Sequence, residues 1–182
     1  GQPVPPPQAP VQTSRHGAPL AFYQPGARLI DNVRLYLFFD FDNTLTTMHM
    51  YNILNGALGA ILANTNAEEI FKRFVASKPA NPELVNIRRF FGTEQRIEAL
   101  TKMFESLSQL GVIIYIISQN FSHIIEYALE QVGLMKYFSS IIGNEADFSK
   151  GKCGYIGQMI PPQSYSILID DNIEIKKDCS GY

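Results

Sequence analysis

The fold is decided by VRLYLFFDFDNTLT, residues 33–46. Its first part, Val33 to Phe39, is mostly apolar and rich in aromatic and branched side chains, which is typical of a strand buried on both faces of a parallel sheet. The apolar run stops at Asp40, and Asp42 follows two residues later. Buried carboxylates are costly unless something pairs with them, and ligands of open α/β sheets bind at the carboxyl ends of the strands. We therefore expect an anionic site that can hold a metal ion at this edge.

Two later apolar runs end in polar residues in the same way. The run 112–117 is followed by Ser118, and the run 165–169 is followed by Asp170 and Asp171. A shorter apolar run, 140–142, indicates a further strand. Because helical patterns over 93–110, 121–132 and 152–159 separate these strands, the sequence predicts an α/β, Rossmann-like, three-layer α/β/α fold with a mostly parallel sheet.

The carboxyl ends of these parallel strands meet at one edge, which brings four aspartates together. Four carboxylates at one place repel one another unless a cation lies between them. Ligands that are all oxygen favour a hard ion, so we expect Mg²⁺. A carboxylate can then attack phosphorus, because the metal neutralises the phosphate oxygens.

Residues 47–92 predict a helical insert between the first strand and the rest of the core, 27–46 and 93–182. Capping residues at 65 and 66 indicate a helix through Val75, and Asn81-Pro82 indicates a second helix to Phe91. The insert is too small to be an independent domain, and we expect it to pack as a cap over the carboxyl edge of the sheet. Residues 1–26 hold more than half of the eleven prolines and are expected to be a tail, a linker or a docking arm.

Composition argues against several classes of partner. A net charge of −2 and a pI near 5.9 provide no electrostatic basis for binding nucleic acid or an anionic membrane. No apolar run approaches the roughly 18–20 residues of a membrane span.

Cys153 and Cys179 show no pairing pattern, so we expect them to be unpaired in a reducing, cytoplasmic compartment. The sequon Asn120-Phe121-Ser122 directly follows a buried-strand pattern, which argues against glycosylation there.

Four of these segments resemble, in the same order, the motifs of the haloacid dehalogenase-like (HAD) hydrolases. The run 40–46, Asp-Phe-Asp-Asn-Thr-Leu-Thr, is similar to their first motif, and the strand that ends in Ser118 is similar to the second. A lysine at 150 or 152 matches the third, and Ile169-Asp170-Asp171 resembles the double-aspartate form of the fourth. The resemblance covers residues 33 to about 175.

The resemblance implies a Mg²⁺-dependent phosphomonoester phosphatase with a small helical cap of the phosphoserine-phosphatase-like kind. Asp40 would be the nucleophile, and Asp42 would protonate the leaving group and then activate water. Mg²⁺ would be bound by Asp40, by the backbone carbonyl of Asp42 and by Asp171, with Asp170 acting indirectly or through water. Ser118 would bind the phosphoryl group, and the residues beside the substrate would include Asn43 and Thr44, the latter supporting the motif loop.

The catalytic lysine is ambiguous in the sequence. Lys150-Gly151 resembles the Lys-Gly form found in phosphoserine-phosphatase-like members of the family, whereas Lys152 is better placed ahead of the apolar residues Ile156 and Met159. We keep both residues, with a preference for Lys150.

Asp42 favours a phosphatase, because the dehalogenases of the family lack this aspartate and the transport ATPases have a lysine there. The cap favours a small phosphorylated metabolite as substrate. Alternatives are a protein phosphatase or phosphotransferase of the same family, and a non-catalytic scaffold that docks through its proline-rich arm.

Three further features each leave two interpretations. Eleven residues follow Asp171, fewer than the family normally has after its fourth motif. Either the chain is shortened, or the fourth strand is a sheet edge that the arm could cover or a second copy could pair with. His49 is expected either against the substrate or in the cap core. Arg96 is expected either to meet a substrate anion or to form an ion pair on a helix surface.

Overall fold

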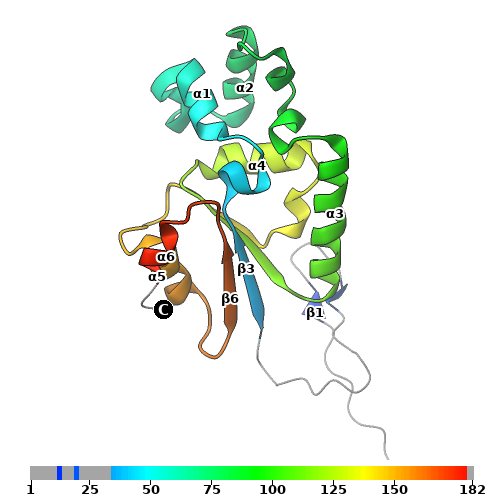
Figure 1. Ribbon diagram of the computed structural model, residues 1–182, viewed down its shortest axis with the longest axis vertical. Helices are drawn as coiled ribbons and strands as arrows, with labels where there is room; N and C mark the ends of the chain where they lie inside the picture. The colour runs from blue at the N-terminus through cyan, green and yellow to red at the C-terminus, as the bar shows by residue number, and fades with distance from the viewer. Residues whose placement is uncertain (1–11, 14–18, 21–33, 180–182) are drawn as a thin grey trace, which may run out of the picture.

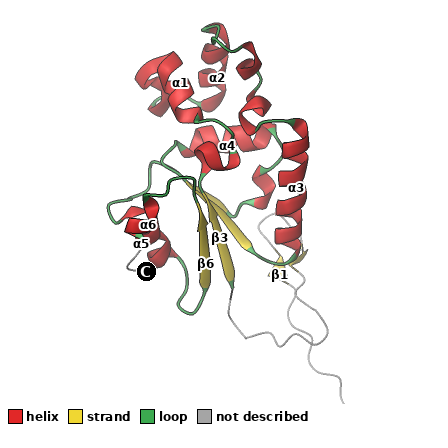
Figure 2. Cartoon of the chain, in the orientation of Figure 1, coloured by secondary structure: helices red, strands yellow, loops and turns green. Residues whose placement is uncertain are grey.

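The computed structural model describes residues 12–13, 19–20 and 34–179 (Figure 1). Most of the predicted proline-rich arm therefore lies outside the described residues, as does Val33. Within the arm, β1 (Gln12–Thr13) and β2 (Pro19–Leu20) pair as antiparallel strands. In the rest of the chain, helices surround a central sheet (Figure 2).

The central sheet is parallel throughout and has the strand order β5-β4-β3-β6. Phe39 at the end of β3 is in register with Ile116 of β4 and with Ile169 of β6. This register brings the residues that follow the three strands to one edge. All four predicted strands are confirmed, as β3 (Leu35–Phe39), β4 (Ile113–Ile117), β5 (Ser140–Ile142) and β6 (Tyr165–Ile169).

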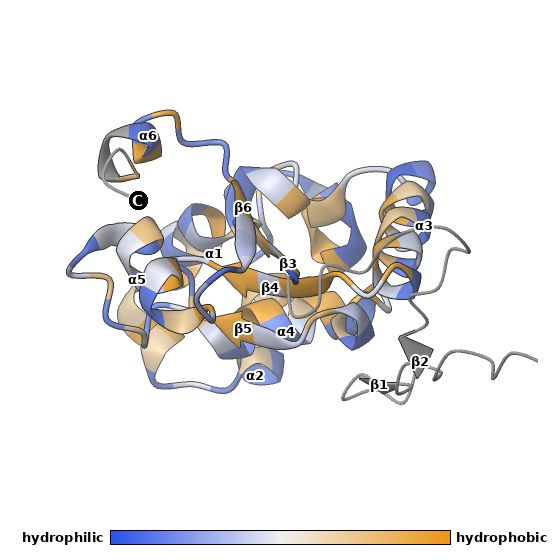
Figure 3. Ribbon diagram, turned by 90° about the horizontal axis from the view of Figure 1, so that it is seen from below, coloured by the Kyte–Doolittle hydropathy of each residue, from blue (hydrophilic) through white to orange (hydrophobic). Residues whose placement is uncertain are grey.

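Helices cover both faces of the sheet, which confirms the three-layer α/β/α prediction. The larger hydrophobic cluster joins one face of the sheet to α3 (Glu94–Gln109) and α4 (Ser122–Gln131). The smaller cluster joins the other face to α5 (Gly151–Met159), with Phe38 and Ile156 among its members. In Figure 3, the central strands β3 and β4 are largely hydrophobic, whereas the helices beside the sheet contain both hydrophobic and hydrophilic residues.

The insert lies beyond the carboxyl ends of the strands (Figure 1). Side chains from the insert, such as Leu54 and Phe74, belong to the same hydrophobic cluster as Ile125 of α4. The backbone N–H of Thr47 donates to Phe90 O at 2.8 Å, which joins the two chain segments that lead into and out of the insert. The insert therefore has no separate core. It consists of α1 (Met50–Leu58), η2 (Gly59–Ala63), α2 (Ala67–Ala76), η3 (Pro82–Val85) and η4 (Ile87–Phe91).

The helix predicted from Pro82 to Phe91 is interrupted. Asn86 is extended (φ −99°, ψ 116°) and separates η3 from η4. Its side chain accepts a hydrogen bond from the backbone N–H of Arg88 at 3.0 Å. Asparagine competes with helical backbone hydrogen bonds in this way, so a second short helix begins where the sequence pattern predicted continuity.

The two cysteines form a disulfide, Cys153–Cys179, with their Cα atoms 5.3 Å apart. The prediction of unpaired cysteines is therefore wrong. The two cysteines are 26 positions apart in the sequence and showed no pairing pattern, but α6 (Ile175–Asp178) packs against α5. Because disulfides persist mainly in oxidising compartments, the cysteines no longer support the predicted reducing compartment.

Two further observations concern the surface. Among the described residues, no helix combines the length and the apolar character that crossing a membrane requires. Within the described part of the chain, β6 is an edge strand of the sheet and pairs with β3. Tyr165 and Ile167 of β6 are exposed.

Candidate active site

The loop that leaves β3 is a tight turn, η1 (Phe41–Leu45), in which Asn43 has a φ of 59°. Asparagine is one of the few non-glycine residues that adopt this left-handed conformation readily. The Thr46 hydroxyl accepts a hydrogen bond from the Asn43 backbone N–H at 3.1 Å and donates to Met48 O at 2.6 Å. The turn sends Asp40 and Asp42 to different neighbours, although they are only two residues apart.

Arg96 holds this loop from outside. Its guanidinium donates to the carbonyl oxygens of Leu45, Thr44 (3.0 Å) and Phe91 (2.8 Å). These acceptors are backbone groups at the end of the loop and of the insert. Arg96 thus donates to backbone carbonyls instead of forming the expected surface ion pair, and a contact with a substrate anion stays a prediction.

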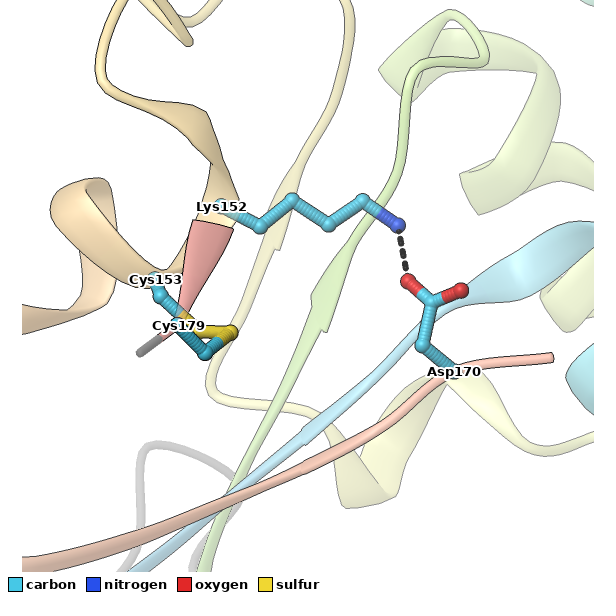
Figure 4. The surroundings of a disulfide bond; sticks show 4 residues. All are labelled: Lys152, Cys153, Asp170 and Cys179. Atoms are coloured by element: carbon cyan, nitrogen blue, oxygen red, sulfur yellow. Dashed lines mark hydrogen bonds and ion pairs between the residues drawn. A yellow bond between two sulfur atoms is a disulfide. The ribbon is translucent and has the colours of Figure 1, made fainter. Parts of the chain in front are cut away.

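Asp40 lies in a charged cluster. The Lys152 Nζ is 2.8 Å from Asp40 Oδ1 and 2.6 Å from Asp170 Oδ2, and Figure 4 shows the lysine extending from α5 to Asp170. Asp40 and Lys152 are both buried. Burial raises the pKa of Asp40 to about 6, although the nearby Lys152 ammonium acts to lower it. This carboxyl group is therefore much easier to protonate than one in water.

The structure brings Lys152 to the site and leaves Lys150 outside it. Gly151 has a φ of 68°, a conformation that suits glycine, and α5 begins there. Lys150 precedes the helix, is exposed, and its charge acts on Asp147. The preference for Lys150 that its Lys-Gly resemblance suggested is therefore not supported by the geometry.

Carboxylate oxygens of Asp40, Asp170 and Asp171 lie within 4.8 Å of one another. This spacing and an all-oxygen donor set fit a hard divalent cation such as Mg²⁺. Asp171 is exposed, and its Oδ1 accepts a 3.4 Å hydrogen bond from the Thr44 hydroxyl. Asp170 is more occupied, because it also accepts the backbone N–H of Asn172 at 2.8 Å.

Asp42 has a different environment, and its carboxylate is not part of this acidic group. Its Oδ1 accepts the backbone N–H of Tyr51 at 3.2 Å, and its Oδ2 accepts the side-chain amide of Asn120 at 3.1 Å. His49 Nδ1 is 3.9 Å from the same Oδ2. Burial raises the pKa of Asp42, an effect that His49 and the hydrogen bonds oppose.

Of the two interpretations of His49 from the sequence, the position in the cap core is wrong, and the contact with the substrate stays a prediction. The His49 side chain is 43% exposed, so it is not in the cap core. Its Nδ1 accepts the backbone N–H of Asn52 at 3.4 Å and caps α1. His49 therefore lies at the entrance to the insert, next to Asp42.

Ser118 is buried at the end of β4. Its backbone N–H donates to Ile142 O at 2.9 Å, and its hydroxyl accepts the backbone N–H of Asn120 at 3.1 Å. Ser118 is thus held at the sheet edge shared by the aspartates. Asn43, by contrast, is exposed and contributes to the turn through its backbone.

Among the groups that contact Asp42, two in particular were missed in the sequence analysis. One is the backbone N–H of Tyr51, which no side-chain pattern reveals. The other is Asn120, which was considered only as part of a sequon. The signal for Asn120 was present, because Ser118-Gln119-Asn120 is a polar run at the end of a buried strand, the feature that also marked Asp40 and Asp170.

A scan of protein-family models found no match, and neither did a search of curated proteins. Among solved structures, the HAD domain of effector protein Lem4 from Legionella pneumophila is similar at 19% identity, with a TM-score of 0.53, over 82% of this chain and 78% of that one. YfnB from Bacillus subtilis, described as a putative HAD-hydrolase bound to magnesium, shares 18% identity at a TM-score of 0.43, over 82% and 86%. A phospho-aspartyl intermediate analogue of phosphoserine phosphatase shares 13% at 0.43, over 81% and 84%. The fold is that of the HAD-like hydrolases.

Proposed function

We propose that this chain, which has the HAD-like fold, is a Mg²⁺-dependent phosphomonoester phosphatase that works through a phosphorylated Asp40. The observation that carries the proposal is the arrangement around Asp40 at the carboxyl edge of the sheet. Lys152 is 2.8 Å from its carboxylate, and Asp170 and Asp171 lie close enough to share a cation with it. Asp42, two residues further along the chain, is also buried, but its carboxylate lies outside this acidic group.

In the first step, an oxygen of the Asp40 carboxylate attacks the phosphorus of the ester. The bond from phosphorus to the ester oxygen breaks, and Asp42 in its acid form gives its proton to the departing oxygen. The Ser118 hydroxyl would hydrogen-bond a phosphoryl oxygen. Lys152 balances negative charge on Asp40 and the phosphoryl group.

In the second step, the Asp42 carboxylate takes a proton from a water molecule as that water attacks phosphorus. The bond to Asp40 breaks, inorganic phosphate leaves, and both aspartates return to their starting states. A divalent cation held by Asp40, Asp170 and Asp171 would neutralise charge on the phosphate oxygens. The different surroundings of the two aspartates suit them to different roles.

The substrate class that we propose is a small phosphorylated metabolite. The support is the insert, which begins beside the site: α1 starts one residue after His49, whose ring is near Asp42. Backbone of α1 also contacts Asp42 directly through Tyr51. A group bound at Asp40 would therefore lie next to the insert.

The test is hydrolysis of a generic aryl phosphate by the purified protein, with and without Mg²⁺, alongside Asp40→Asn. We expect Mg²⁺-dependent turnover that the variant lacks, and beryllofluoride with Mg²⁺ should occupy Asp40 in the wild type only. Turnover that Asp40→Asn does not change would refute the proposal. A panel of phosphorylated metabolites and phosphopeptides then tests the substrate class, since a clear preference for phosphopeptides would favour a protein phosphatase.

A further inference from the structure

We propose that Asn120 is a positioning residue that holds the Asp42 carboxylate in place for proton transfer to the leaving oxygen. The inference rests on the proposed function, in which Asp42 is the acid. It adds a residue from outside the four motifs, and it explains how an acid on the turn after β3 is held against the phosphate-binding end of β4.

Asn120 is only 2% exposed, and each of its polar groups has a partner. Its side-chain Nδ2 donates to Asp42 Oδ2 at 3.1 Å, and its Oδ1 accepts the backbone N–H of Phe121 at 2.8 Å. Because a backbone N–H can only donate, Oδ1 must face Phe121, and the NH₂ group must then face Asp42. The amide is therefore held in the orientation in which it donates to the acid.

The backbone of Asn120 is held as well. Its N–H donates to the Ser118 hydroxyl at 3.1 Å, and its carbonyl accepts the N–H of Asn144 at 2.9 Å. One buried residue thus contacts both the proposed phosphate ligand and the proposed acid. A shift of Asn120 would therefore change the distance between Ser118 and Asp42.

The loop after β5 supports this arrangement from the other side. A Cβ atom at Gly143 would lie 2.9 Å from Asn120 O and 2.5 Å from the backbone N of Ser122, so glycine allows the loop to approach this closely. The carboxylate of Glu145 accepts hydrogen bonds from the Ser122 N–H (3.2 Å) and hydroxyl (3.0 Å). The start of α4, and Asn120 with it, is fixed against this loop.

Asn120 comes from a different part of the fold than Tyr51 and His49, which also lie near Asp42. Tyr51 and His49 both belong to the insert or its entrance, and they contact Asp42 through a backbone N–H and a ring nitrogen. Asn120 belongs to the core, directly after β4. Its amide therefore ties Asp42 to the sheet edge where Asp40 and Ser118 lie.

The experiment compares substrates that need the acid with substrates that do not. An alkyl phosphate has a poor leaving group and depends on a well-placed proton donor, whereas p-nitrophenyl phosphate does not. In Asn120→Ala we expect kcat/KM for the alkyl phosphate to fall by about 10²-fold, the order of magnitude for a misplaced catalytic group. For p-nitrophenyl phosphate the loss should be only a few-fold.

Asn144→Ala is the matched control. Its side chain is exposed and donates to Gln119 O at 3.1 Å, so the variant disturbs the same loop without touching Asp42. It should lower kcat/KM equally for both substrates, if at all. Thermal unfolding of every variant checks folding, and Asn120→Ser provides a second test at the same position, because serine is too short to reach Asp42.

The outcomes separate the two proposals. Equal losses for both substrates in the folded Asn120 variants, or no loss, would overturn the role of Asn120. A wild-type protein that hydrolyses neither substrate with Mg²⁺ would instead overturn the proposed function. A selective loss in Asn120→Ala or Asn120→Ser, absent from Asn144→Ala, supports the inference.

Discussion

Asp40 and Asp42 lie two residues apart on one loop, are similarly buried, and have different surroundings. Asp40 faces an ammonium group and two further carboxylates. Asp42 faces a neutral amide, a backbone N–H and, at 3.9 Å, a histidine ring nitrogen. The first environment suits a metal-bound nucleophile, and the second suits a group that gains and loses a proton.

The comparison shows how one short motif provides two kinds of chemistry. The turn at Asn43 separates the two side chains, and residues far away in the sequence complete each environment. Lys152 and Asp170 complete the first, and Asn120 completes the second. The surroundings of Asp40, which we call the Asp40 half of the site, can therefore be changed without directly touching those of Asp42. Four predictions test this separation, and they are given from the largest expected effect to the smallest.

The largest effect should come from exchanging the aspartates themselves. Asp40→Asn should lower kcat by about 10⁴-fold or more, because the nucleophile is lost, whereas Asp42→Asn should cost about 10²–10⁴-fold, as for an acid–base group. Mass spectrometry of protein incubated with p-nitrophenyl phosphate should detect phosphorylated Asp42→Asn protein but no phosphorylated Asp40→Asn protein. Equal absence of phosphorylated protein in both variants would mean that the two roles are not divided as proposed.

Lys152→Gln should have the next largest effect, on stability. Removing the ammonium leaves Asp40 and Asp170 facing each other without compensation, and breaking a buried ion pair costs about 3–5 kcal/mol. Urea unfolding of the metal-free protein measures this cost. Lys150→Gln is the control and should change the free energy of unfolding by about 0.5 kcal/mol or less, as is usual for a surface substitution. Similar losses in both variants would contradict the assignment of Lys152.

Loss of the disulfide should lower the stability of the protein and should affect activity only through the surroundings of Asp40. The disulfide joins α5, which carries Lys152, to the segment that follows Asp171, so Cys179→Ser should lower the free energy of unfolding by about 3 kcal/mol. The Mg²⁺ concentration needed for half-maximal activity should rise, while the preference between alkyl and nitrophenyl phosphates should not change. A dithiol reductant should lower the melting temperature of the wild type and leave that of Cys179→Ser unchanged. A changed leaving-group preference would show that the halves are coupled.

The smallest effect is a shift of pH dependence. Below its pKa the Asp40 carboxyl group carries a proton and cannot attack, and above its pKa it is ionised and can. Since burial raises this pKa to about 6, kcat/KM at limiting Mg²⁺ should rise with pH through about 6. Saturating Mg²⁺ favours the ionised form, so the rise should move to lower pH. Asp42→Asn should retain it, and its disappearance there would assign the rise to Asp42 instead.

Much of the fold followed from local patterns. Apolar runs that end at polar residues predicted all four strands of the central sheet, because strands buried on both faces carry few polar side chains. Asn66, whose side chain accepts the Glu69 backbone N–H at 2.8 Å, marked the start of α2 in the sequence. The order of the motifs also indicated that Asp40, Ser118 and Asp170 would share one edge, since parallel strands of one sheet end on the same side.

The sequence by itself thus determined the strands, their polar ends and the kind of chemistry that oxygen ligands at one edge support. Tertiary structure alone decided which partners complete the site. Lys152 is the second residue of α5, whereas Lys150 precedes the helix, so the start of α5 at Gly151 determines which lysine reaches Asp40. Asn120, Arg96 and the Cys153–Cys179 pair act across separations of 26 to 78 residues. Local propensity carries no information about such contacts, because they exist only once the chain has packed.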